Sequence, residues 1–259
     1  HYSKKELGKD MYQFFIEDEN AAEDFVTIEG SDVNHIKNVL RMKPGEKIRV
    51  CTRNGQNYFC SISDITESFV RADILEKEAE STELPCRIYL FQGLPKNDKM
   101  EWIIQKTVEL GVYEVIPVAM KNCVVKLDDK KAKSKVMRWQ AIAESAAKQS
   151  KRSLIPEVKM PMSYKEAVAY AKELDVKLVP YENEHGMAGT KAAMEQIKKG
   201  ESIAVFIGPE GGFAPEEIAL VQDEMQLISL GKRILRTETA GIAALAILGY
   251  QLESSDMIE

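Results

Sequence analysis

A glycine-rich segment in the second half of the chain has the features of a ligand-binding loop. An apolar run at 204–207 is followed by the sequence GPEGG at 208–212 and by a helix start at Pro215 with two glutamates after it. Glycine has no Cβ, so the backbone of such a loop can approach a ligand closely at the carboxyl end of a strand. The spacing differs from that of a phosphate-binding loop, and Glu210 would repel phosphates, which favours a nucleotide without a phosphate chain. An ordinary tight turn is the alternative interpretation.

A second candidate loop, LGKRILRTETA at 230–240, follows a predicted strand and leads into a helix rich in small residues. Ile234 and Leu235 stand between basic residues, which favours a loop that turns one side toward an adenine ring. Arg236 and Thr239 would then face polar groups. A plain strand-to-helix loop with solvated arginines is the alternative.

Both loops lie in a region where predicted strands and helices alternate, which indicates an α/β fold with a largely parallel sheet covered on both faces. The predicted strands are 87–92, 115–120, 177–181, 203–208 and 227–230. The predicted helices are 98–110, 129–150, 164–174, 191–199, 215–224 and 240–253. Ligands of such sheets bind outside the carboxyl ends of the strands, where both loops are expected to lie.

The N-terminal part has a different pattern, with five short strands and one helix that together predict a small β-barrel. The predicted strands are 12–17, 25–29, 47–52, 58–64 and 69–75. The helix is expected to begin at Ser31 or Asp32 as N-cap, and Asn54-Gly55 predicts a hairpin in which both central residues adopt positive φ. The polar run 76–85 is a predicted linker, which gives domains at 11–80 and 81–259. Residues 1–10 are expected to be a poorly ordered lead-in.

The formal net charge of −6 conceals one strongly basic segment. Between residues 121 and 152 there are ten lysine or arginine residues and three acidic ones. Apolar residues recur at three-to-four spacing along the predicted helix 129–150, so most of the lysines lie on its other face. Such a face favours nucleic-acid phosphates as ligands, with a merely solvated helix surface as the alternative.

The composition argues against several classes of protein. No segment approaches the roughly 20 apolar residues of a membrane span, and the N-terminus is too charged for a secretory signal, so we expect a cytoplasmic protein without membrane contact. The four cysteines form no C-x-x-C pair and the three histidines share no ligand spacing, so we expect reduced cysteines and no bound metal. A nucleotide-dependent oxidoreductase would need a G-x-G-x-x-G fingerprint, which does not occur after an early strand.

FIGPEGG at 206–212 and LGKRILRTETA at 230–240 closely resemble the signature of the SPOUT-class methyltransferases, and most closely that of the RsmE family. Other segments match that family in order: GLPK at 93–96, KME at 99–101, QKTVELG at 105–111, ESAAKQS at 144–150, and then Arg152 and Pro156. His35, Leu40, Arg41 and Gly45 match its N-terminal barrel. The resemblance extends from about residue 11 to residue 253, with departures at Lys148, where the family usually has Glu, and at Gly241, where it often has Pro.

The resemblance implies a C-terminal SPOUT domain with a deep trefoil knot and an N-terminal PUA-like RNA-binding barrel. It implies S-adenosylmethionine (SAM) as cofactor and N3 of a uridine in 16S ribosomal RNA as methyl acceptor, in free RNA or in the small subunit. It also implies a homodimer, with 98–111 and the last helix as subunit contacts. A non-catalytic RNA-binding protein of ribosome assembly is the alternative, although it leaves the two loops without a role.

The resemblance assigns SAM to a pocket with three walls formed by the knot. The implied cofactor-binding residues are Val179, Pro180, Tyr181, Glu182, Ile207, Gly208, Pro209, Glu210, Gly211, Gly212, Leu230, Gly231, Ile234, Leu235, Arg236, Thr239 and Ala240. The expected RNA-binding residues are Arg41, Lys96, Lys99, Lys131, Lys135, Arg138, Gln149 and Arg152. Close backbone approach at Gly211 predicts that a bulky residue there abolishes cofactor binding.

Methylation at uridine N3 requires removal of a weakly acidic proton or stabilisation of the resulting anion. The candidate catalytic residues are Arg236, which would steady the negative charge, and Glu210 and Glu238, either of which would accept the proton. For the two carboxylates, hydrogen bonding to loop backbone is the alternative.

Overall fold

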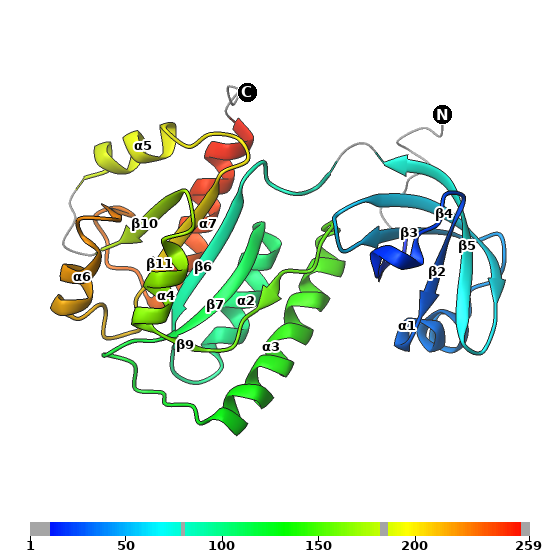
Figure 1. The fold of residues 1–259 in the computed structure, drawn as a ribbon, viewed down its shortest axis with the longest axis horizontal. Coiled ribbons are helices and arrows are strands. Elements are labelled where there is room, and N and C mark those ends of the chain that lie inside the picture. The colour runs from blue at the N-terminus through cyan, green and yellow to red at the C-terminus, as the bar shows by residue number, and fades with distance from the viewer. Residues whose placement is uncertain (1–10, 79–80, 182–185, 255–259) are drawn as a thin grey trace. The chain divides into compact units, whose positions relative to one another are not determined.

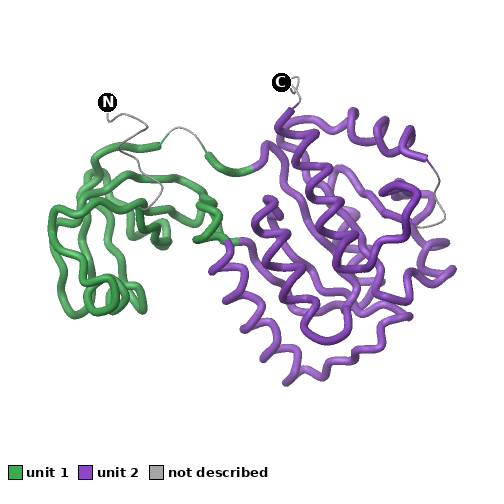
Figure 2. Tube along the Cα trace, turned by 180° about the vertical axis from the view of Figure 1, so that it is seen from behind, with its two compact units in different colours: residues 1–83, 147–155 green, residues 84–146, 156–259 purple. Residues whose placement is uncertain are grey.

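The computed structural model describes residues 11–78, 81–181 and 186–254, so the lead-in predicted at 1–10 lies outside the described residues. The chain forms two compact units, which Figure 2 shows in different colours. The first unit contains His1–Glu83 together with Ala147–Ile155, and the second contains Leu84–Ala146 and Pro156–Glu259. The sequence predicts that all residues from 81 onward belong to the second domain. The structure instead places residues 147–155 in the first unit.

Buried polar contacts attach this short segment to the first unit. Arg152 is 3% exposed, and its Nε lies 3.3 and 3.2 Å from the two carboxylate oxygens of Glu83. The backbone N–H of Ser153 donates to the same carboxylate at 2.9 Å, and the Ser153 hydroxyl accepts from the Asn57 side chain at 2.7 Å. Pairings over such sequence separations leave no local pattern that the sequence could reveal.

The first unit is a five-stranded sheet in the order β1-β3-β4-β5-β2. The strands are β1 (Gln13–Ile16), β2 (Phe25–Glu29), β3 (Lys47–Thr52), β4 (Asn57–Ile65) and β5 (Phe69–Glu78). β1 pairs parallel with β3, and the other neighbours are antiparallel. The edge strands β1 and β2 come close to each other, and alternate apolar side chains fill the enclosed core.

Two local expectations for this unit were wrong. The helix α1 (Ser31–Asn34) begins after Gly30, whose φ of 72° only glycine adopts readily, and a π-helical turn, His35–Val39, continues it. At the β3–β4 hairpin, Gly55 has a φ of 85°, whereas Asn54 is not among the described non-glycine residues with positive φ. The Asn54 side chain instead accepts from the N–H of Gln56 at 3.2 Å, which shapes a longer turn.

The second unit contains a seven-stranded sheet in which all the pairings are parallel, as predicted. Its order is β12-β10-β11-β6-β7-β8, and β9 also pairs with β7. The strands are β6 (Arg87–Gly93), β7 (Val112–Ala119), β8 (Glu157–Val158), β9 (Met162–Ser163), β10 (Val176–Pro180), β11 (Ser202–Ile207) and β12 (Gln226–Ile228). β8 and β9 were not predicted, because two residues are too few to show a periodic pattern.

Helices cover both faces of this sheet (Figure 1). They are α2 (Lys99–Glu109), α3 (Asp129–Gln149), α4 (Tyr164–Ala171), α5 (Ala188–Glu195), α6 (Pro215–Val221) and α7 (Thr237–Ser254). On one face, α4 and α6 pack over Phe91 and Phe206, whose rings stack with centroids 4.4 Å apart. On the other face, α2 and α7 pack against each other and against β6, β7 and β11. The strands β10, β11 and β12 therefore end side by side at one edge of the sheet.

Candidate active site

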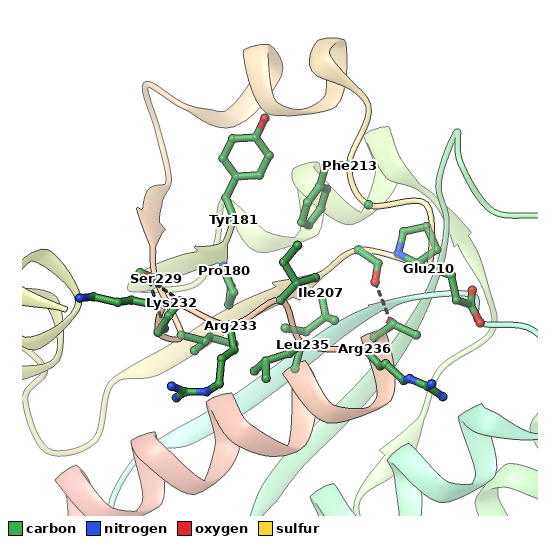
Figure 3. Close-up of a pocket in the computed structure, with 18 of the residues that line it drawn as sticks. Pro180, Tyr181, Ile207, Glu210, Phe213, Ser229, Lys232, Arg233, Leu235 and Arg236 are labelled. Atoms are coloured by element: carbon green, nitrogen blue, oxygen red, sulfur yellow. Dashed lines mark hydrogen bonds between the residues drawn. The ribbon is translucent and has the colours of Figure 1, made fainter. Parts of the chain in front are cut away.

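A cavity of about 630 Å³ lies at this edge of the sheet, bounded by the chain segments that follow β10, β11 and β12 (Figure 3). Its lining residues are Lys99, Pro180, Tyr181, Ile207, Gly208, Pro209, Glu210, Gly212, Phe213, Ser229, Leu230, Gly231, Lys232, Arg233, Ile234, Leu235, Arg236, Thr237 and Ala240. The structure thus brings together both loops that the sequence singled out.

Three described residues that were expected in the pocket are not among its lining residues. Val179 is fully buried in the sheet core, because a strand side chain alternates between faces and this one points under α4 and α6. Thr239 is exposed in the first turn of α7, which begins three residues earlier than predicted. Glu182 lies outside the described residues. The third described residue, Gly211, packs against Asn122.

Gly211 faces a neighbouring turn instead of the cavity. An ideal Cβ built on Gly211 would lie 2.9 Å from the Cβ of Asn122. The Asn122 side chain donates hydrogen bonds to the carbonyl oxygens of Gly211 at 3.0 Å and Gly212 at 3.2 Å. The contact with Asn122 is therefore by itself a reason for glycine at position 211, and the predicted approach of its backbone to a ligand stays a prediction.

Several lining residues were not predicted, and some of them complete the apolar wall. Phe213 and Tyr181 stand on the same side of the cavity as Ile207 (Figure 3). Lys232 and Arg233 lie at the opposite end from Glu210 in that view. The cavity therefore combines an apolar middle with charged ends, a combination typical of sites for polar small molecules. Phe213 directly follows the GPEGG sequence, and this position next to the loop is the feature from which its place in the cavity could have been predicted.

A buried hydrogen-bond chain fixes the start of α7 to the glycine loop. Gln92, which is fully buried, donates from Nε2 to the Thr237 hydroxyl at 2.9 Å, and Thr237 in turn donates to the carbonyl oxygen of Gly208 at 2.7 Å. This anchoring explains why α7 begins at Thr237, before its apolar periodicity starts. Gly241 allows the helix to approach, since an ideal Cβ there would lie 3.3 Å from Gln92 Oε1.

At one end of the cavity, Lys99 lies between two carboxylates. Its Nζ is 3.0 Å from Glu210 Oε1 and 3.3 Å from Glu238 Oε2. Burial works against ionisation of Glu210, but hydrogen bonds from the Lys96 N–H and from Lys99 outweigh it and lower the pKa of Glu210. The hydrogen bond to Glu210 raises the pKa of Lys99 above its ordinary value, and the negative charge of the neighbouring Glu238 carboxylate acts in the same direction. Glu210 and Lys99 therefore face each other as ionised groups.

Arg236 is exposed at the cavity wall, and its guanidinium group forms no hydrogen bond or ion pair with the part of the chain that the structure describes. It lies at the same end as Glu210 in Figure 3. Its donors are therefore available to a ligand. Glu210, in contrast, already accepts from the Lys96 backbone at 3.0 Å and from Lys99, so it holds the loop before α2.

The expected RNA-binding residues are distributed over both units, and two of them have other roles. Arg152 is buried against Glu83 and is withdrawn from the set, because a guanidinium group used in this way cannot contact a phosphate. Lys99 lines the cavity. Arg41, Lys96 and Gln149 are exposed. On α3 and its flank, three side chains lie near acidic groups: Lys131 at 3.6 Å from Asp128, Lys135 at 3.8 Å from Asp98, and Arg138 at 2.7 Å from Glu101.

Within residues 11–78, 81–181 and 186–254, no group of three His, Cys, Asp or Glu side chains is placed to hold a metal ion. Cys51, Cys60 and Cys86 are buried and Cys123 is partly buried, all of them as free thiols. Burial raises the pKa of Cys51 and of Cys60 to about 12, so these thiols stay protonated at neutral pH. No described helix is both long and apolar enough to span a membrane.

Comparison with known proteins covers nearly the whole chain. A model of an RNA methyltransferase domain matches residues 82–249, and a model of an RNA methyltransferase PUA domain matches residues 28–75. The ribosomal RNA small subunit methyltransferase E of Bacillus subtilis is 39% identical over 231 residues, which cover 88% of this chain and 90% of that protein. The protein of the same name from Mesomycoplasma hyopneumoniae is 36% identical over 233 residues, covering 90% and 96% of the two chains.

A solved structure extends this similarity to three dimensions. The crystal structure of a ribosomal RNA small subunit methyltransferase E from Neisseria gonorrhoeae, bound to S-adenosyl methionine, is 32% identical to this chain. It matches with a TM-score of 0.78 and covers 92% of this chain and 96% of that one.

Proposed function

This chain belongs to the ribosomal RNA small subunit methyltransferase E family of RNA methyltransferases, and on that premise we propose that it methylates N3 of a uridine in 16S ribosomal RNA. SAM is the proposed methyl donor. A SPOUT-type trefoil knot in the second unit and a cytoplasmic location, where ribosomal RNA is found, are parts of the same proposal. The observation that carries it is the cavity between the two loops, with the guanidinium group of Arg236 free at its wall.

The cavity fits SAM in size and in chemistry. Sites for ligands of this class occupy about 300–1,000 Å³, and this one has about 630 Å³. Ile207, Leu235 and Phe213 provide apolar contacts for an adenine ring, and backbone groups of the glycine loop and of Leu230 border the same space. Bound there, SAM supplies a methyl group activated by its sulfonium charge.

Arg236 is the proposed catalytic residue. When uridine N3 attacks a methyl group, negative charge develops on the imide as its proton leaves, and a guanidinium donor directed at it stabilises that charge. The loops align the reactants, which is a large part of catalysis for an in-line displacement. Glu210 is engaged with Lys96 and Lys99 and takes a structural role in this proposal.

Mass spectrometry of ribosomal RNA from a strain that lacks this gene tests the proposal. We expect one 3-methyluridine in 16S RNA to disappear and to return when the purified enzyme and SAM are added to small subunits or free RNA. A methyl group missing from another base would retain the enzyme class and reject the uridine assignment. An unchanged RNA methylation profile would reject the function itself.

The glycine loop offers a structural prediction about the cofactor. An ideal Cβ on Gly93 would lie 2.7 Å from the backbone nitrogen of Pro209, so Gly93→Ala must displace the loop. Overpacking costs about 1–3 kcal/mol, and displacement of the loop is expected to weaken SAM binding about tenfold, as measured by calorimetry. Gly189→Ala is the control, since a Cβ there meets no atom within 4 Å. Equal SAM affinity in Gly93→Ala and the wild type would show that the loop does not bind the cofactor.

The exposed lysines of α3 are the proposed phosphate contacts in the second unit. Lys130 and Lys133 are both exposed. Lys130→Glu with Lys133→Glu is expected to weaken RNA binding about tenfold at low salt and to lower the slope of log Kd against log salt by about one per lost contact. The control carries the same charge change on other helices, as Lys165→Glu with Lys191→Glu. Equal losses of RNA affinity in both double variants would show that only the net charge of the protein matters.

We also propose a homodimer that uses α2 and α7. The two helices pack against each other, and Trp102 on α2 is 54% exposed and Tyr250 on α7 is 75% exposed. Large aromatic side chains exposed on adjacent helices are typical of protein contacts. Trp102→Lys with Tyr250→Lys is expected to halve the molar mass measured by light scattering. A dimer that survives this change would place the subunit contact on another surface.

A further inference from the structure

Lys99 occupies a position that its sequence context did not indicate. It is the first residue of α2, and its side chain, 28% exposed, lies between Glu210 from the loop after β11 and Glu238 from the first turn of α7. Its Nζ is 3.0 and 3.3 Å from the nearest oxygens of these carboxylates. A lysine held on two sides in this way is a poor contact for RNA phosphates.

The two carboxylates differ in what else they contact. Glu210 Oε1 also accepts from the backbone N–H of Lys96 at 3.0 Å, so its position is fixed by two donors. Glu238 Oε2 is buried and accepts no hydrogen bond within the described residues, although it lies within ion-pair distance of Lys99. Glu238 is thus the carboxylate that retains capacity to accept a proton, two residues after Arg236.

Among the described residues, Lys99 is the only cation that pairs with either of these two carboxylates. Two carboxylates sharing a site repel each other unless a positive charge lies between them. Without the ammonium group, this repulsion would turn Glu238 away from Glu210, which lines the cavity.

We propose that Lys99 is a positioning residue for methyl transfer, whose ammonium group holds the Glu238 carboxylate where it accepts the N3 proton of the uridine. The inference rests on the proposed function. In the step it describes, the N3–H bond breaks and the proton passes to Glu238. The N3 electron pair forms the new bond to the methyl carbon, and the bond from that carbon to sulfur breaks with its electron pair going to sulfur.

The test is a double-mutant cycle of Lys99→Met and Glu238→Gln, measured as turnover at saturating RNA and SAM. A misplaced catalytic group costs about 10²-fold, so Lys99→Met should lose turnover by that order while the RNA KM and the salt dependence of RNA binding stay unchanged. In the Glu238→Gln background, Lys99→Met should lower turnover little further, because both substitutions remove the same contribution to catalysis. Lys99→Arg should restore much of the turnover. Lys106→Met is the control, since Lys106 lies on the same helix, pairs with Glu109 at 2.9 Å and has a side chain 30% exposed.

Three results would overturn the inference. A raised RNA KM with normal turnover would return Lys99 to the RNA-binding surface. Additive losses in the double variant would show that Lys99 does not act through Glu238. Full turnover in Glu238→Gln would remove that carboxylate as proton acceptor, while the methylated product of the wild type would still support the proposed function. If the wild type itself forms no 3-methyluridine, the proposed function fails first.

Discussion

Arg236→Ala is expected to lower turnover on saturating RNA by about 10²–10³, while its affinity for SAM changes little. Removal of a donor that stabilises a developing anion typically costs about 2.7–4 kcal/mol in the transition state. Arg236 lines the cavity, and its guanidinium group forms no contact with the described part of the chain, so little of the fold depends on it. Single-turnover rates with labelled SAM measure the effect directly, and calorimetry measures cofactor binding.

Two further variants make this result specific. Arg236→Lys is expected to regain only part of the activity, because a point charge does not reproduce a planar fork of donors. Arg233→Ala is the matched control, since Arg233 lines the other end of the same cavity (Figure 3). Normal turnover of Arg236→Ala at saturating RNA would mean that Arg236 only helps to hold the substrate.

Arg152→Met is expected to lower the free energy of unfolding of the first unit by about 3–5 kcal/mol. Removing one partner of a buried ion pair leaves the other charge buried without compensation. The side chains of Arg152 and Glu83 are only 4% and 17% exposed, so solvent screens this pair weakly. Hydrogen exchange of peptides from β4 (Asn57–Ile65) measures the stability of this unit. Tryptophan fluorescence does not, because Trp102 and Trp139 both lie in the second unit.

The matched control is Arg53→Met in the same unit. Arg53 pairs with Glu17 at 2.7 Å, but their side chains are 75% and 49% exposed, and such surface pairs contribute about 0–1 kcal/mol. The double variant Arg152→Met with Glu83→Leu should recover part of the lost stability, because it removes the uncompensated carboxylate. If Arg152→Met weakened RNA binding without faster exchange in β4, the original assignment of Arg152 to the RNA surface would be right.

Much of the site followed from the sequence because it is built from contiguous segments. Glycine, proline and a following amphipathic pattern mark a strand, a loop and a helix in succession, and the parallel alternation places such loops at one edge of the sheet. The loops at 208–212 and 230–240 therefore appear in the cavity as expected. Local spacing also fixed most of the strands and helices to within a few residues.

Tertiary structure decided the features that depend on partners distant in the chain. Gly211 is close to Asn122, Thr237 is anchored by Gln92, and Lys99 lies between two carboxylates that follow it by more than 100 residues. Arg152 belongs to a basic segment of the sequence, but in the structure it is buried against Glu83. Sequence pattern reports the period and the composition of a segment, whereas the burial of a charge and the identity of its counter-ion arise only when separate elements pack together.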